Sequence, residues 1–223
     1  MLDFYLSTVA DGTMKSPDQN FASALPARTA FMQQHDIAPA HTTLVQVVYE
    51  GNNYCRYVTV TSAEKGDGIT RNASIVADGI VVTEPQHALF LPLADCIGAI
   101  IHDPEQNILM LSHLGRHNIE QFGGTKSIEY LAHHHGCNPQ VLTVWLSPAA
   151  SKEHYPLYTF TNRSLHDVAI EQLIAAGIQR ANITASPIDV ANNDTYFSHS
   201  QFLKGNKPTD GRHAVVARLL PLL

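Results

Sequence analysis

The sequence predicts an α+β (mixed α/β) fold, built as a single layered domain over residues 1–223 with mixed β-sheets and flanking helices. Three observations indicate this class. Short apolar segments typical of strands recur along the chain, a few helical segments are interspersed among them, and neither a repeat nor a low-complexity linker divides the chain. With 223 residues, the chain is also long enough to bury a sizeable core.

The first half of the chain is expected to be mostly β-structure. A strand over residues 4–9 precedes a loop and a helix over residues 20–34. Residues 43–61 predict a β-hairpin, because the strong turn signal Glu50-Gly51-Asn52-Asn53 separates two apolar segments. The further strands expected in this half cover residues 78–83 and 87–93.

The centre of the chain predicts an antiparallel strand pair, Ile97–Ile101 and Ile108–His113, joined by a tight turn. Cys96 begins the first strand and His113 ends the second, so this pairing brings the two side chains together. A facing thiol and imidazole can form either a soft metal site or an activated sulfur nucleophile.

The second half contains the clearest helices. Residues 125–135 predict a helix that ends at Gly136, and residues 164–176 predict one that ends at Gly177, since glycine is typical just beyond a helix C-terminus. The other expected elements are strands over residues 141–146 and 183–185, a functional loop or strand over residues 197–200 and a closing strand over residues 214–220.

Composition excludes several classes of function. The formal net charge is −6 and no run of Lys or Arg is present, so nucleic-acid binding has no electrostatic basis. No apolar run approaches the roughly 18 residues of a membrane span, and Met1-Leu2-Asp3-Phe4 lacks the features of a secretory signal. The three cysteines do not form a disulfide framework. We therefore expect a cytoplasmic protein that binds neither nucleic acid nor membranes.

Cys96, His113 and Asp95 are the candidate catalytic residues. A lone buried cysteine is usually an inert apolar side chain. Here Asp95 precedes it within an apolar run, and a carboxylate there needs hydrogen-bond partners or solvent, which indicates a cleft. His117, four residues after His113, completes a candidate metal-ligand set of Cys96, His113 and His117, although a solvated surface histidine is an equal alternative.

Four further residues are candidates for substrate binding. Arg212, in Asp210-Gly211-Arg212, can present a guanidinium to a phosphate or carboxylate, or form an ordinary surface ion pair. The other three candidates are Arg116, His199 between two serines, and Tyr155 in a polar loop after a strand. No P-loop, GxGxxG, GxSxG or paired CxxC motif occurs, so NTPase, Rossmann and serine-hydrolase chemistry lack support.

Six short segments occur in a specific order: Ala77-Asp78-Gly79 with Thr83, Leu93-Ala94-Asp95-Cys96, His113-Leu114-Gly115, Leu146-Ser147-Pro148-Ala149, Phe197-Ser198-His199 and Gly211-Arg212. This ordered series resembles the YfiH-type laccase-domain family, also described as multicopper polyphenol oxidase-like, whose members act as purine nucleoside phosphorylases. The resemblance implies a layered fold with mixed sheets, similar to that of the cysteine-dependent catalytic domain of cytotoxic necrotizing toxins.

The resemblance also implies a zinc ion, or less plausibly copper, bound by Cys96, by His113 and by a histidine of an earlier Gln-Val-His-Gly segment. This chain departs from that pattern, because it has Gln46-Val47-Val48-Tyr49-Glu50-Gly51, with Val48 or Tyr49 where the histidine would fall. His117 or His199 is then the alternative third ligand. A four-metal copper site is disfavoured, since His-x-His spacing occurs in this chain only within residues 133–135.

These observations support three hypotheses. The first is a zinc-dependent enzyme that processes purine nucleosides, by phosphorolysis or deamination of inosine or adenosine, with a nucleoside and phosphate as its small-molecule substrates. The second is a metal-free Cys-His hydrolase or amidase, in which Asp95 or Asn118 orients the base. The third is a non-catalytic descendant of the family that binds a ligand or partner.

Overall fold

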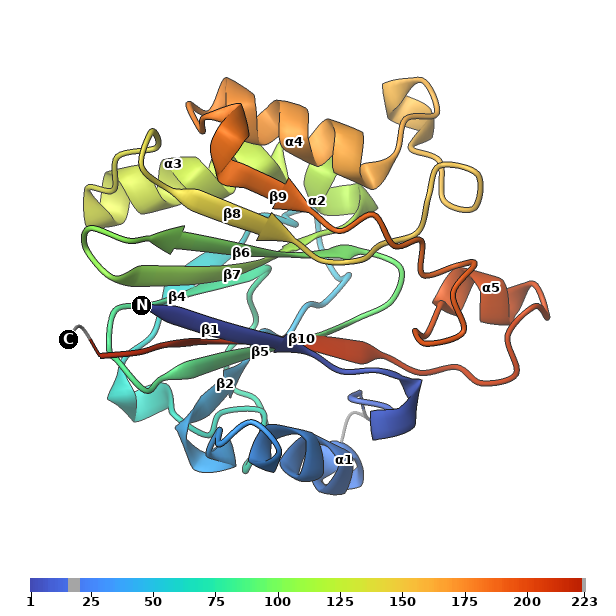
Figure 1. Ribbon diagram of the computed structural model, residues 1–223, viewed down its shortest axis with the longest axis horizontal. Helices are drawn as coiled ribbons and strands as arrows, with labels where there is room; N and C mark the ends of the chain where they lie inside the picture. The colour runs from blue at the N-terminus through green and yellow to red at the C-terminus, as the bar shows by residue number, and fades with distance from the viewer. Residues whose placement is uncertain (16–20, 222–223) are drawn as a thin grey trace.

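The computed structural model describes residues 1–15 and 21–221, which form four layers in the order helices, sheet, sheet, helix (Figure 1). Helices α2–α4 cover the outer face of one sheet, and α1 covers the outer face of the other. Both sheets contain parallel and antiparallel pairs. The predicted α+β class with mixed sheets and flanking helices is therefore confirmed.

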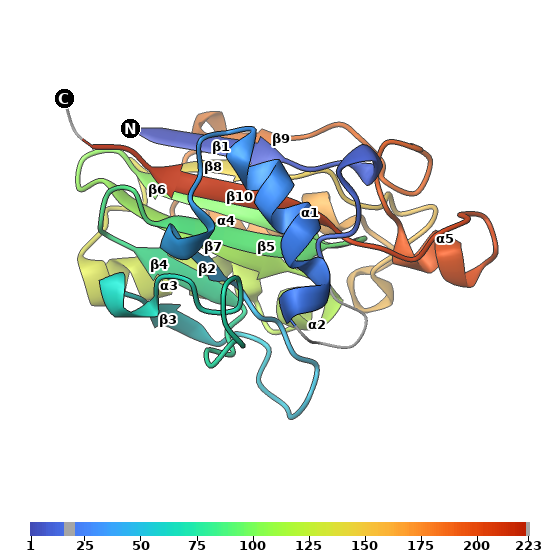
Figure 2. The same ribbon diagram turned by 90° about the horizontal axis from the view of Figure 1, so that it is seen from below.

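The first sheet has four strands and carries helix α1 on its outer face (Figure 2). Its strands are, in spatial order, β1 (Leu2–Leu6), β10 (His213–Leu219), β5 (Ala88–Leu93) and β2 (Thr42–Leu44). Only the β2–β5 pair is parallel. Helix α1 (Phe21–Gln33) packs Phe31 and Met32 against Phe90 and Val216 of this sheet.

The second sheet has six strands and contains the predicted central pair. Its strands are, in spatial order, β3 (Tyr57–Thr59), β4 (Gly79–Val82), β7 (Ile108–Leu114), β6 (Ile97–Asp103), β8 (Thr143–Leu146) and β9 (Ile183–Ala185). The helices on its outer face are α2 (Arg116–Glu120), α3 (Gly123–His135) and α4 (Leu165–Ala175). Strands β6 and β7 pair antiparallel, as predicted.

Alternate residues of a central strand face two different cores. In β5, Leu89 and Leu91 pack between the sheets, whereas Ala88 and Phe90 pack against α1. Because both faces of each sheet are covered, its central strands are nearly continuous apolar segments.

Local signals set the ends of the predicted helices. The Ser164 hydroxyl accepts a hydrogen bond from the Asp167 N–H at 3.1 Å at the start of α4. Gly136 and Gly177, with φ of 66° and 101°, follow α3 and α4. The expected strand over residues 141–146 is shortened to β8, and the expected helix over residues 20–34 is α1, with Asn20 outside the described residues.

The hairpin expected over residues 43–61 is wrong. Strand β2 pairs parallel with β5 in the first sheet, and β3 pairs parallel with β4 in the second. The turn at Glu50–Asn53 lies within a segment that crosses from one sheet to the other. Each strand finds its partner in a different layer, which a local turn signal does not specify.

Two other expectations need correction. The strand expected over residues 4–9 is β1, followed by a 3-10 turn over Val9–Asp11. Of the loop or strand expected over residues 197–200, the loop holds for Phe197 and Ser198, whereas His199 and Ser200 begin the short helix α5 (His199–Leu203), which Ser198 caps by accepting the Gln201 N–H. The remaining 3-10 segments are Pro39–His41, Ser62–Glu64, Tyr158–Phe160 and Arg180–Asn182.

Within residues 1–15 and 21–221, we find no helix with both the length and the apolar character needed to cross a membrane.

Candidate functional site

The β6–β7 pair brings Cys96 and His113 together. Cys96 directly precedes β6, and His113 on β7 lies opposite Gly98 on β6. An ideal Cβ built on Gly115 would lie 2.8 Å from the Cys96 Sγ and 2.9 Å from the His113 Nε2. Both atoms therefore converge on the same point, and the predicted proximity is confirmed.

Gly115 is required for this convergence. The φ of Gly115 is −105°, which any residue can adopt, so its backbone conformation does not demand glycine. The demand is steric, because real Cβ atoms do not approach other heavy atoms as closely as 2.6 Å, the distance to the His113 Cε1.

Burial keeps both groups neutral. Burial raises the pKa of the Cys96 thiol to about 12, and the charge of Asp95 adds to this effect, whereas a hydrogen bond from the Arg116 backbone N–H opposes it. Burial likewise lowers the pKa of His113 to about 4. The His113 Nδ1 is buried and finds no hydrogen-bond partner within residues 1–15 and 21–221. At neutral pH the pair is a thiol beside an uncharged imidazole.

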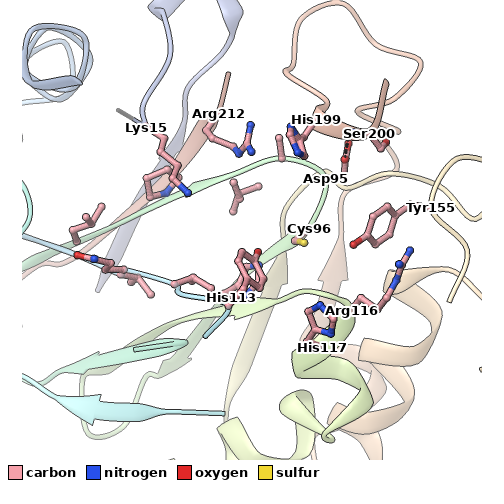
Figure 3. A pocket seen from close by; sticks show the side chains of 18 of the residues that line it. Lys15, Asp95, Cys96, His113, Arg116, His117, Tyr155, His199, Ser200 and Arg212 are labelled. Carbon is pink, nitrogen blue, oxygen red and sulfur yellow. Dashed lines mark hydrogen bonds between the residues drawn. The ribbon is translucent and has the colours of Figure 1, made fainter. Parts of the chain in front are cut away.

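A cavity of about 530 Å³ opens beside this pair (Figure 3). With the exception of Asn118, the alternative orienting group, whose side-chain amide instead donates to the Tyr54 carbonyl oxygen at 2.7 Å, every residue predicted from the sequence to serve in catalysis, substrate binding or metal binding lines it. These residues are Asp95, Cys96, His113, Arg116, His117, Tyr155, His199 and Arg212. They come from five separate segments of the sequence, which supports treating the cavity as the functional site.

Four cations line the cavity, and the sequence analysis identified two of them. Arg116 and Arg212 were expected, whereas Lys15 and Arg28 were missed. Arg28 is 3% exposed and projects from α1 at the spacing of core residues, four after Ala24 and three before Phe31. An arginine on the apolar stripe of a helix was the signal that could have revealed it.

Arg28 is held without a carboxylate partner among the described residues. Its Nε and Nη1 donate hydrogen bonds to the carbonyl oxygens of Met14 and Gly68, each at 2.8 Å. Its guanidinium carbon also lies 5.5 Å from the centre of the Phe90 ring. Burial lowers the pKa of Arg28 to about 10, so it remains a cation near neutral pH. A bound anion would supply the missing countercharge.

Arg116 stacks on aromatic rings at the other side of the cavity (Figure 3). Its guanidinium carbon lies 4.4 Å from the Tyr155 ring centre and 5.8 Å from that of Tyr158. The Arg116 Nε is buried and makes no hydrogen bond to any described residue. The stack fixes a flat, cationic surface beside Cys96.

Arg212 and His199 share one carboxylate. Asp210 accepts a hydrogen bond from Arg212 Nη1 at 2.7 Å and contacts His199 Nδ1 at 3.0 Å. Gly211 makes room for the Phe197 ring, whose Cε1 lies 2.4 Å from an ideal Cβ at that position. The segments 197–199 and 211–212 therefore pack together at the rim of the cavity.

Asp95 anchors the start of α5. It is 3% exposed and accepts a short hydrogen bond from the Ser198 hydroxyl, together with one from the Ser200 N–H at 2.8 Å. Both carboxylate oxygens thus bind the segment that carries His199. This geometry gives Asp95 a positioning role, while its catalytic role stays a prediction.

With this geometry in place, comparison with known proteins identifies the family. Residues 18–163 match the family model described as multi-copper polyphenol oxidoreductase laccase. The chain belongs to this laccase-domain family. No curated protein matches the chain in a sequence search.

Solved structures show the same fold at low sequence identity. The hypothetical protein YfiH of Bacillus licheniformis is similar with a TM-score of 0.83 and 17% identity, over 98% of this chain and 92% of that one. YlmD from Geobacillus stearothermophilus is similar with a TM-score of 0.83 and 16% identity, over 99% of this chain and 92% of that one. Neisseria meningitidis protein NMB0706 is similar with a TM-score of 0.72 and 16% identity, over 99% of this chain and 95% of that one.

The laccase-domain site of this chain does not assemble three metal donors. His117, the predicted third ligand, stacks on Tyr54, and the two ring centres lie 4.8 Å apart. Its side chain is 51% exposed, and its Nδ1 lies 3.9 Å from a carboxylate oxygen of Glu120. No group of three or more His, Cys, Asp and Glu residues in the described part of the chain is placed to hold a metal ion. Cys96 and His113 are two donors, and zinc binding stays a prediction.

Proposed function

We propose that this laccase-domain protein cleaves purine nucleosides by phosphorolysis, binding the nucleoside and phosphate in the cavity beside Cys96. The observation that carries the proposal is the charge of the lining. Lys15, Arg28, Arg116 and Arg212 are cationic, whereas Asp95 is the one carboxylate among the described lining residues. Such a lining favours a small anionic substrate such as phosphate.

The two sides of the cavity suit the two substrates. Lys15 and Arg212 lie together on one side (Figure 3), and partial burial followed by the charge of Arg212 lowers the pKa of Lys15. These cations, together with Arg28, are the proposed phosphate contacts. On the other side, the stacked Arg116 and Tyr155 offer a planar surface on which a purine can lie.

The reaction is a displacement at the ribose. A phosphate oxygen forms a bond to C1′ while the bond from C1′ to the purine N9 breaks, and the base leaves with the electron pair and takes up a proton. The cations hold the phosphate in place and offset its charge, and the neutral Cys96 and His113 adjoin the reacting groups without adding charge.

Deamination fits the described donor set less well. It requires an activated water, and a zinc ion would supply one by lowering the pKa of bound water toward about 7. The chain gathers two of the donors that such an ion needs. We therefore favour phosphorolysis.

The test is release of hypoxanthine from inosine and of adenine from adenosine, with and without phosphate. We expect release that depends on phosphate and falls at least about 100-fold in Arg28→Met and Arg212→Met, because each removes a charge-assisted contact. Arg163→Met is the matched control, since Arg163 pairs with Glu171 on the surface away from the cavity lining. Absence of base release from both nucleosides in the presence of phosphate would refute the proposal.

A second candidate, the Cys-His hydrolase, rests on the proximity of Cys96 and His113. A nucleophilic thiolate requires a lowered thiol pKa, whereas burial raises that of Cys96 to about 12. Alkylation of Cys96 at neutral pH distinguishes the candidates. A rate slower than that of free cysteine favours the phosphorolysis proposal, and a faster one favours the hydrolase.

A further inference from the structure

Tyr49 lines the cavity with the Cys96–His113 pair and has no part in the proposed mechanism. Its ring centre lies 6.4 Å from that of His113 and 6.0 Å from that of His117, both in edge-on arrangements. The residue is 57% exposed, so its ring lies at the mouth of the cavity.

The structure distinguishes the two residues that the sequence left as alternatives for the third-ligand position. Tyr49 lines the cavity together with Cys96 and His113, whereas Val48 does not. The backbone at this point is fixed, because the Val48 carbonyl accepts a hydrogen bond from Arg56 Nη2 at 2.7 Å. Arg56 is in turn paired with the buried Asp78 at 2.7 Å.

The other nearby donors are engaged elsewhere. The Asp95 oxygens bind the start of α5, His199 contacts Asp210, and His117 stacks on Tyr54. A protonated phenol is not among the usual zinc ligands, which are thiolate, imidazole and carboxylate. Among the described residues, Cys96 and His113 therefore remain the two side chains available as zinc donors at this position.

We infer that Tyr49 occupies the position of the third metal ligand, so that this cavity holds no resident zinc ion and binds its ligand through its cations and neutral polar groups. The inference concerns the same cavity as the proposed function. It predicts that a single substitution creates a zinc site, because Cys96 and His113 already converge.

The experiment compares the metal content of the wild type with that of Tyr49→His and Tyr49→Phe. Each protein is purified without chelator, incubated with zinc chloride and desalted before measurement. We expect about one zinc ion per chain in Tyr49→His, where a third imidazole joins the thiol and His113, and well below one in the other two. Adding Cys96→Ala to Tyr49→His should remove the bound zinc.

Two results would overturn the inference. The first is nearly stoichiometric zinc in the wild type that Cys96→Ala removes. The second is a Tyr49→His protein that unfolds cooperatively, as the wild type does, but gains no zinc.

If Tyr49→His does not fold, alkylation of wild-type Cys96 decides the question, with the modified residue identified by mass spectrometry. A rate unchanged by added zinc supports the inference, and protection by zinc overturns it. None of these measurements uses a nucleoside, so failure of the phosphorolysis proposal would be distinguishable from failure of this one.

Discussion

At the scale of single residues, close packing around the Cys96–His113 pair leaves no room at position 115. The Gly115→Ala substitution should destabilise the fold by about 1–3 kcal/mol, because its Cβ meets atoms of both side chains. Urea unfolding measures this change. Gly205→Ala is the comparison, since its ideal Cβ meets nothing within 4 Å and only its φ of 77° is strained. A loss at Gly115 no larger than that at Gly205 would contradict the steric argument.

His213 is a second residue whose environment has a measurable consequence. It is fully buried, neither ring nitrogen has a hydrogen-bond partner among the residues that the structure describes, and burial lowers its pKa to about 3. Between its unfolded pKa of about 6.5 and its folded one, the unfolded chain binds the extra proton. Stability should therefore fall as the pH decreases from about 6.5 toward 3, and His113 and His87 contribute in the same direction over pH 6.5 to about 4.

The His213→Met substitution should reduce this loss of stability, because it removes a buried polar group that titrates only on unfolding. The measurement is the free energy of unfolding in urea at pH 7 and pH 5. We expect the difference in the free energy of unfolding between pH 7 and pH 5 to be smaller by about 1–2 kcal/mol in this variant than in the wild type. The exposed His133 provides the control substitution, His133→Met. An unchanged difference in the His213 variant would contradict the expectation.

At the scale of elements, helix α5 depends on one carboxylate. The Asp95→Asn substitution weakens the bonds to Ser198 and Ser200 and should cost about 1–3 kcal/mol, since Asp95 and Ser198 are buried. Hydrogen exchange over residues 198–203 should accelerate while the β6–β7 pair stays protected. Asp194→Asn, at a fully exposed residue, is the control. Unchanged exchange in α5 would show that other contacts hold it.

The elements also show what local sequence can and cannot specify. The ends of α3 and α4 were predictable because Gly136, Gly177 and the Ser164 cap act within a few residues. The prediction of a hairpin was wrong because the pairing of a strand depends on residues far away in the sequence. The residue 43–61 segment contains strands and a bend in the expected places, but its two strands join different sheets.

At the scale of the whole molecule, the cavity concentrates positive charge within a chain of net charge −6. Phosphate should therefore stabilise the folded protein, by about 2.7 kcal/mol at a concentration 100 times its Kd. Thermal unfolding with increasing phosphate tests this, and the effect should weaken with added sodium chloride. The shift should disappear in Arg28→Met and persist in Arg163→Met. An equal shift in both variants would assign the effect to general salt stabilisation.

The sequence identified most of the residues that line the site, but not their arrangement in space. The ordered segments identified Cys96, His113, His199 and Arg212, and the polar loop after a strand identified Tyr155, and all five line one cavity. Arg28 carried a signal, its place on the apolar stripe of α1, but a single sequence does not show that α1 and the loop that carries Lys15 pack beside the cavity. The failure of His117 to join the two donors likewise depends on its stacking with Tyr54, which comes from the crossing segment.

The crossing segment between β2 and β3 has a consequence for how such a protein can change over evolutionary time. Val45, Gln46, Val47 and Tyr49 of this segment line the cavity, and residues 45–56 contribute no strand to either sheet. Substitutions at its lining positions therefore alter the chemistry offered to a ligand at little cost to the architecture. Relatives with the same scaffold are thus free to diverge in the groups they present at this one connection. Variation in activity within the family should concentrate in this segment, while the layers around it persist.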